Sequence, residues 1–107
     1  MSEAKFTKGP WHCHRNTSFW EFGCDERGQL GDVCASAFTP EGRAPDAEET
    51  MEANAHLIAS APELYEALRM AAKDLNTAAH FLPDTGLALL ETVKQAHAAL
   101  AKARGEA

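Results

Sequence analysis

Hydrophobic and polar positions follow two different periods along this chain. In its first 40 residues they alternate in short, aromatic-rich runs, and over 18–24 this alternation places Trp20, Phe22 and Cys24 on one face. Polar turns containing glycine separate the runs, which is typical of antiparallel strands. We therefore expect a β-hairpin or a three-stranded meander in residues 1–40, with that face toward the core.

Beyond residue 45 the hydrophobic positions recur at helical spacing. Asp46 with Glu49 forms a capping box that predicts one helix start, and Ser60 with Glu63 predicts another. A third helix follows a short turn, so the last two helices should pair as an antiparallel hairpin. The predicted apolar stripes are Ala47, Met51, Asn54, Ile58 and Ala61; Leu64, Leu68, Ala71, Leu75, Ala78 and Leu82; and Leu89, Val93, Ala96, Leu100 and Ala103.

The fold class that follows is α+β, in a single domain spanning residues 1–107, with a strand region at 1–40 and a helical region at 46–104. Of 107 residues, 21 are Ala and only three are Val or Ile, so helix should dominate. Leu, Ile, Val, Phe and Met together number 21. Because so small a domain buries only about two-thirds of its unfolded surface, we also expect a homodimer that adds burial.

The formal charge of −6 arises in one segment, 41–66, which holds seven acidic residues and one basic residue, while the rest of the chain is balanced. Phosphate backbones require clustered Lys and Arg, so direct nucleic-acid binding is not expected. A basic protein surface is the partner that this segment favours. Solubility and helix-dipole stabilisation are the alternative explanation. The side chains expected to bind the partner are Glu48, Glu49, Glu52, Glu63 and Glu66.

The compartment follows from what the chain lacks. No run approaches the roughly 20 apolar residues of a membrane span, and no apolar stretch follows the N-terminal lysines as it would in a signal peptide. We therefore expect a cytoplasmic protein without membrane contact, whose cysteines are reduced thiols.

Several residue types that bind zinc occur in the strand region, but their spacing is unfavourable. The gaps between successive cysteines are 11 and 10 residues, and there is no second close pair. Glu48 and Glu52 have a spacing that suits a metal or an acid–base pair, although a solvated helix face is commoner. We expect no cofactor and no catalytic activity. The alternative zinc ligands are Cys13, His14, Cys24 and Cys34.

Three further residues are assigned structural roles. Asn54 is the polar member of the first helical stripe, and burying an unpaired amide costs about 1–3 kcal/mol. We expect its amide to bond backbone groups and to clamp the helix to the sheet, with a ligand contact as the alternative. Trp11 and Trp20 should belong to the core, with an interface role as the alternative.

Two stretches of the sequence resemble small accessory proteins of bacteriophages and prophages. Residues 7–11, Thr-Lys-Gly-Pro-Trp, are similar to a Thr-Pro-Gly-Pro-Trp-like start, with a departure at Lys8. Residues 52–68 are similar to an Asn-Ala-Arg-Leu-Ile-Ala-Ala-Ala-Pro-Glu-Leu-like helix junction, with departures at His56, Ser60 and Tyr65. The two stretches cover 22 of 107 residues. The resemblance implies a phage or prophage origin and action inside a bacterial cell, and it carries over no catalytic residue.

Together, the charge pattern and the resemblance predict a non-enzymatic phage or prophage protein that binds and inhibits or modulates a host protein in the bacterial cytoplasm. The partner we expect is an antiviral defence component with a basic nucleic-acid site, an anti-CRISPR-like role, because spaced carboxylates can imitate phosphates. Two other classes stay open: a small metal-dependent or nucleotide-handling enzyme, and a structural phage component.

Overall fold

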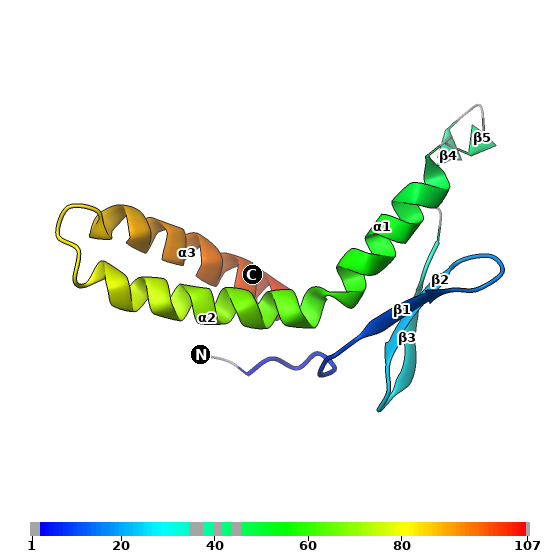
Figure 1. The fold of residues 1–107 in the computed structure, drawn as a ribbon, viewed down its shortest axis with the longest axis horizontal. Helices are drawn as coiled ribbons and strands as arrows, with labels where there is room; N and C mark the ends of the chain where they lie inside the picture. The colour runs from blue at the N-terminus through cyan, green and yellow to red at the C-terminus, as the bar shows by residue number, and fades with distance from the viewer. Residues whose placement is uncertain (1–2, 35–37, 40–41, 44–45, 107) are drawn as a thin grey trace. The chain divides into compact units, whose positions relative to one another are not determined.

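The computed structural model describes residues 3–34, 38–39, 42–43 and 46–106 (Figure 1). An antiparallel sheet is followed by three helices, the last two packed together, which confirms the predicted α+β fold. The strand β5 lies beyond the predicted strand region. In chain order the elements are β1 His12–Arg15, β2 Trp20–Cys24, β3 Gly28–Val33, β4 Phe38–Thr39, β5 Gly42–Arg43, α1 Ala47–Ala59, α2 Ala61–Ala79 and α3 Gly86–Ala103.

Contacts within the chain group its residues into two compact units. The first, which we call the meander unit, is Lys8–Pro62, and the second, the hairpin unit, is Met1–Thr7 together with Glu63–Ala107. Each has buried apolar residues of its own. The single-domain organisation stays a prediction.

The meander unit is built on a three-stranded antiparallel sheet with the order β1-β2-β3. Its first turn is organised by Asn16, whose side-chain oxygen accepts hydrogen bonds from the backbone N–H groups of Ser18 at 2.9 Å and Phe19 at 2.7 Å. After the second turn, β3 begins at Gly28 with φ of 74°, a backbone conformation that residues other than glycine rarely adopt. These local devices set the two antiparallel pairings. A separate two-stranded sheet joins β4 and β5.

Helix α1 covers one face of this sheet and forms the core with it. Met51 is 1% exposed and Ala55 is fully buried, and together with the buried Val33 of β3 they form one hydrophobic cluster. The strand face predicted to be inward does pack here, since Trp20 and Phe22 lie against this cluster. The other side chains packed against it are Cys13, Phe19 and Ile58. Trp11 is half-buried and stacks on Phe22, with ring centroids 5.8 Å apart.

The buried stripe of α1 is rotated from the predicted one. It consists of Ala47, Met51, Ala55 and Ala59, whereas Asn54 is exposed. Consecutive helical residues differ by about 100° around the axis, so placing Ala55 against the sheet turns Asn54 out of the interface. The small Ala55 side chain lets the helix backbone approach the sheet closely. The prediction that Asn54 is a buried clamp is therefore wrong.

The helix starts were predicted correctly, but the capping boxes were not. Asp46 precedes α1 without a side-chain capping bond to the backbone. Ser60 closes α1 instead of opening α2, because its hydroxyl donates a hydrogen bond of 2.9 Å to the carbonyl of His56. Pro62 lies in the first turn of α2, where a missing N–H costs nothing.

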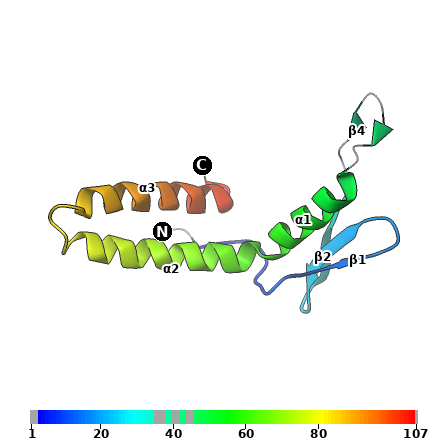
Figure 2. The same ribbon diagram turned by 45° about the horizontal axis from the view of Figure 1, so that its top comes forward.

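The hairpin unit pairs α2 with α3, which lie side by side in Figures 1 and 2. A β-carbon added at Gly86 would lie 2.4 Å from the carbonyl oxygen of Ala79, so glycine permits the close approach where the two helices meet their turn. At the end of the hairpin away from this turn, Arg104 Nη1 donates a hydrogen bond of 3.0 Å to the hydroxyl of Tyr65. Phe6 packs edge-on against the Tyr65 ring.

The seam between α2 and α3 agrees with the predicted stripe on α3 but not on α2. Val93, Ala96 and Leu100 of α3 are buried as predicted, and Ala103 is exposed. On α2, beyond Pro62 in its first turn, the buried positions are Ala72 and Ala79. The predicted α2 stripe lies to one side of the seam: Leu64, Leu68, Ala71 and Leu82 are exposed, and Leu75 and Ala78 are half-buried.

Candidate functional site

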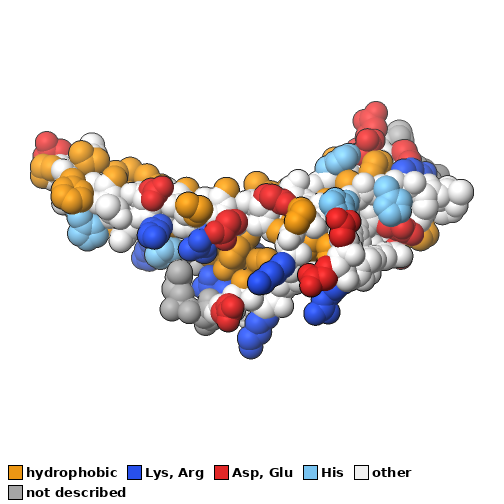
Figure 3. Space-filling model, turned by 60° about the horizontal axis from the view of Figure 1, so that its bottom comes forward, with side chains coloured by type: hydrophobic (Ala, Val, Ile, Leu, Met, Phe, Trp, Pro, Cys, Tyr) orange, Lys and Arg blue, Asp and Glu red, His pale blue; other side chains and the backbone are white. Residues whose placement is uncertain are grey.

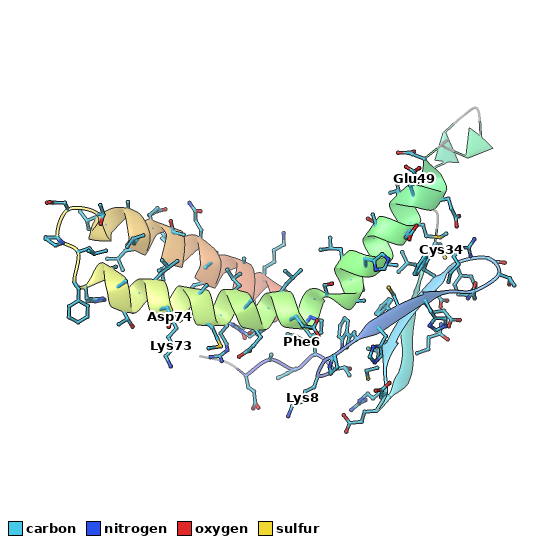
Figure 4. All side chains as sticks on the ribbon, in the orientation of Figure 1. Phe6, Lys8, Cys34, Glu49, Lys73 and Asp74 are labelled. Atoms are coloured by element: carbon cyan, nitrogen blue, oxygen red, sulfur yellow. The ribbon has the colours of Figure 1, made fainter. Side chains whose placement is uncertain are left out.

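The candidate site at the start of α1 consists of Glu48, Glu49 and Glu52, which we call the α1 carboxylates. All three are exposed, and Glu48 and Glu52 flank the buried stripe on the side next to β1, where Arg15 and Cys13 are their neighbours. Figure 4 labels Glu49 on the side of α1 away from the sheet. The sheet thus holds the helix with these carboxylates toward solvent.

Two of the α1 carboxylates have basic neighbours within the meander unit. Glu48 Oε1 accepts a hydrogen bond of 2.8 Å from Arg15 Nε, and Glu52 Oε1 lies 3.8 Å from His56 Nε2. Both pairs are exposed, so each contributes little to stability. Acidic and basic side chains are interspersed on the face seen in Figure 3. The charge of the segment is thus partly paired.

The remaining predicted carboxylates, Glu63 and Glu66, lie on α2 in the hairpin unit. Glu66 accepts hydrogen bonds from Arg69 Nη2 at 2.5 Å and from Arg69 Nε at 3.1 Å, and these bonds lower the pKa of the carboxyl. Glu63 is exposed in the first turn of α2. That the five carboxylates form one surface stays a prediction, because they belong to two units.

A contact that the sequence analysis missed joins β1 to α1. Cys13 Sγ lies 3.5 Å from His56 Nδ1, and the other ring nitrogen of His56 faces Glu52. Burial, together with the negative charge of Glu52, raises the pKa of the Cys13 thiol. A raised pKa keeps the thiol protonated at neutral pH, whereas a nucleophilic cysteine needs a lowered one. The arrangement therefore favours a packing role. The two residues are 43 positions apart, so only strand alternation, which turns Cys13 inward, hinted at the contact.

The two neighbours of Cys13 on β1 lie on the opposite face of the sheet. His14 Nε2 is 2.7 Å from Glu21 Oε2, and His12 Nε2 is 3.2 Å from Asp25 Oδ1. A shallow hollow of about 280 Å³ is lined by both histidines. In the part of the chain that the structure describes, no three His, Cys, Asp or Glu side chains are grouped to hold a metal ion. Cys13, Cys24 and Cys34 are free thiols.

Asn54 lies at an open hollow of about 470 Å³ between the end of β3 and the second half of α1. Leu57, which is 62% exposed, forms part of its wall. A ligand contact by Asn54, the alternative to the clamp, stays a prediction. The full lining is Asp32, Val33, Cys34, Asn54, Leu57 and Ile58.

The fold and its surfaces define a small α+β protein, with a helix-covered meander and a helical hairpin. Among the residues described, no helix is both long and apolar enough to cross a membrane. A family model matches residues 1–107, and the chain belongs to the family of Salmonella phage P22 protein Y8K6. No curated protein and no solved structure matches the chain. The family supports a phage protein, as the resemblance implied, while the two sequence stretches that carried the resemblance stay untested.

Proposed function

We propose that this phage protein acts without catalysis, by binding a host protein in the bacterial cytoplasm and inhibiting or modulating it through the α1 carboxylates. The observation that carries the proposal is how α1 is held. Met51 and Ala55 are 1% and 0% exposed, whereas the carboxylates on the same helix are open to solvent. A helix fixed in this way presents its charged residues at a set backbone spacing, so little backbone conformational entropy is lost when a partner binds.

The chemistry of these side chains selects the class of partner. Carboxylates repeated along one helix complement a surface rich in Lys and Arg, such as the nucleic-acid site of a defence protein. The chain's formal charge of −6 would speed the encounter with such a surface. Glu63 and Glu66 would extend the contact if the partner also reaches the hairpin unit.

Glu52 separates this proposal from the explanation by helix stability alone. Glu48 and Glu49 are in the first turn of α1, where a negative charge interacts favourably with the helix dipole. That effect falls off within the first turn, so it gives Glu52 little stabilisation. Glu52 also raises the pKa of Cys13, a neighbour that gains nothing from its charge. The pair that Glu52 makes with His56, one turn along the helix, is exposed and is worth only about 0.2–0.5 kcal/mol. Binding supplies a role for Glu52 that this small contribution to helix stability does not.

The experiment that tests the proposal is a pull-down from host-cell lysate with three baits. These are the wild-type protein, the variant Glu48→Lys, Glu49→Lys, Glu52→Lys, and a control variant. We expect a basic host protein to be captured by the wild type and the control but not by the α1 variant. Equal capture by all three baits would overturn the proposal. The control carries the same change of charge at exposed acids outside the segment 41–66: Asp74→Lys, Asp84→Lys and Glu91→Lys.

Circular dichroism shows whether the α1 variant is folded. Exposed ion pairs are worth about 0–1 kcal/mol, so losing the bond between Arg15 and Glu48 should leave the fold intact. Loss of capture by a variant that keeps its helical signal assigns the effect to the surface.

A further inference from the structure

Helix α2 carries an apolar stripe that the hairpin does not bury. The stripe consists of Leu64, Leu68, Ala71, Leu75 and Ala78, and it follows the 4-3-4-3 spacing of a seam between two helices. Leu64 is 52% exposed and Leu68 is 36% exposed. The buried alanines of α2 are Ala72 and Ala79 instead, so among the described residues Leu64, Leu68 and Ala71 stay exposed and Leu75 and Ala78 are half-buried.

We propose that the α2 stripe is covered by the α2 stripe of a second copy of this chain, with the two helices antiparallel about a two-fold axis between Leu68 and Ala71. This arrangement places Leu68 of each copy against Ala71 of the other, so a large side chain meets a small one twice beside the axis. It also pairs Leu64 with Leu75 on either side. The stripe is thus complementary to itself, and it contains no charged residue whose burial would be costly.

The hairpin face has the size that a stable dimer needs. Helices of 19 and 18 residues are about 28 Å long and each is about 10 Å wide, so two of them present a footprint of about 28 Å by 20 Å. The side chains project from this footprint, which brings its accessible area near the roughly 800 Å² per partner of a standard interface. Helical spacing puts Ala99 and Ala103 of α3 on the same side, and both are exposed. Two hairpins face to face would form a four-helix bundle.

The hairpin unit also has a physical reason to associate. Its buried side chains are small apart from Val93 and Leu100, since the other buried positions are alanines and Gly86. Small units with so few large apolar residues commonly gain stability by oligomerising. A second copy supplies leucines for the side of the hairpin that its own core does not reach.

Light scattering on the full chain tests this proposal with a matched pair of variants. Leu64→Glu places one charge on the stripe, whereas Met70→Glu places one charge on a residue of the same helix that is as exposed as Leu64, at 52%, but lies off the stripe. We expect twice the 11.6 kDa monomer mass for the wild type and for Met70→Glu, and the monomer mass for the stripe variant. A monomeric wild type well above micromolar concentration, or a dimer in all three proteins, would overturn the proposal.

Disulfide cross-linking tests the register and does not depend on how the charged variant folds. Leu68→Cys and Ala71→Cys chains, each with the three native cysteines replaced by Ala, are mixed under mild oxidation. Facing β-carbons within about 4 Å of each other can form a disulfide, so the mixture should give a covalent dimer. Met70→Cys chains treated in the same way should stay monomeric. No cross-linking in the mixture, or equal cross-linking in both samples, would contradict the proposed pairing.

Discussion

Cys13, His56 and Glu52 form a cluster that resembles a catalytic arrangement but has the opposite electrostatics. The thiol and the imidazole are 3.5 Å apart, yet the neighbouring carboxylate and partial burial favour the neutral thiol. At neutral pH the thiol therefore stays protonated. A cysteine in contact with a histidine is therefore not a nucleophile unless its surroundings also lower the pKa of the thiol.

The reactivity of the cysteines should follow this environment. We predict that Cys34, which is exposed, reacts with iodoacetamide before Cys13, which is half-buried and has a raised pKa. Glu52→Gln removes the negative charge that disfavours the thiolate, so it should lower the pKa of Cys13 and speed its alkylation a few-fold. Mass spectrometry of the labelled peptides over a pH series checks both statements. Alkylation of Cys13 that is faster than that of Cys34 in the wild type would show that the thiol is activated.

Asn54 and Met51 should respond to substitution in opposite ways. Asn54 is exposed on α1, so Asn54→Ala should change the free energy of unfolding by about 0.5 kcal/mol or less. Met51 is 1% exposed in the core, so Met51→Ala should cost about 2–5 kcal/mol through the cavity it leaves. Urea denaturation of the two variants measures both values. A large loss of unfolding free energy in Asn54→Ala would instead support the prediction that the Asn54 side chain is buried and holds the helix to the sheet.

The orientation of the helices about their axes was harder to predict from sequence than their existence. Alanine is so frequent that α1 has a second stripe at helical spacing, through Ala55, beside the predicted one through Asn54, and α2 has a second one through Ala72. The choice depends on which side lets the backbone approach its neighbour most closely, a tertiary property. Strand alternation was more informative, because it places two large aromatic side chains, Trp20 and Phe22, on the same face of the strand.

The turn between α2 and α3 depends on a close approach that only glycine permits. Gly86→Ala would place a methyl group 2.4 Å from the backbone oxygen of Ala79, and a backbone atom cannot move aside cheaply. We predict a loss of about 1–3 kcal/mol in stability, the usual cost of overpacking. Thermal unfolding followed by circular dichroism measures it. Leu87→Ala, at a neighbouring residue that is 80% exposed, is the control and should unfold close to the wild type.

At the scale of the whole molecule, the charge of the middle segment was visible in the sequence, but its pairing was not. Carboxylates on an amphipathic helix are predictably exposed, so the position of Glu49 follows from the pattern alone. The bond from Arg15 to Glu48 joins residues 33 positions apart, and no local rule predicts it. The division of the five acidic residues between two units likewise has no signal in the sequence, because the segment from Ser60 to Pro62 reads as an ordinary junction between two helices.

The central claim is that the α1 carboxylates bind a host protein, and the most direct test is the affinity of the purified protein for its captured partner as ionic strength rises. Between 0.1 M and 1 M salt the Debye length falls from about 10 Å to about 3 Å, which screens attraction between exposed charges. We predict that wild-type affinity falls steadily over this range, and that the variant Glu48→Lys, Glu49→Lys, Glu52→Lys binds at least tenfold more weakly at the lowest salt. An affinity that is insensitive to salt and unchanged in the variant would contradict the claim.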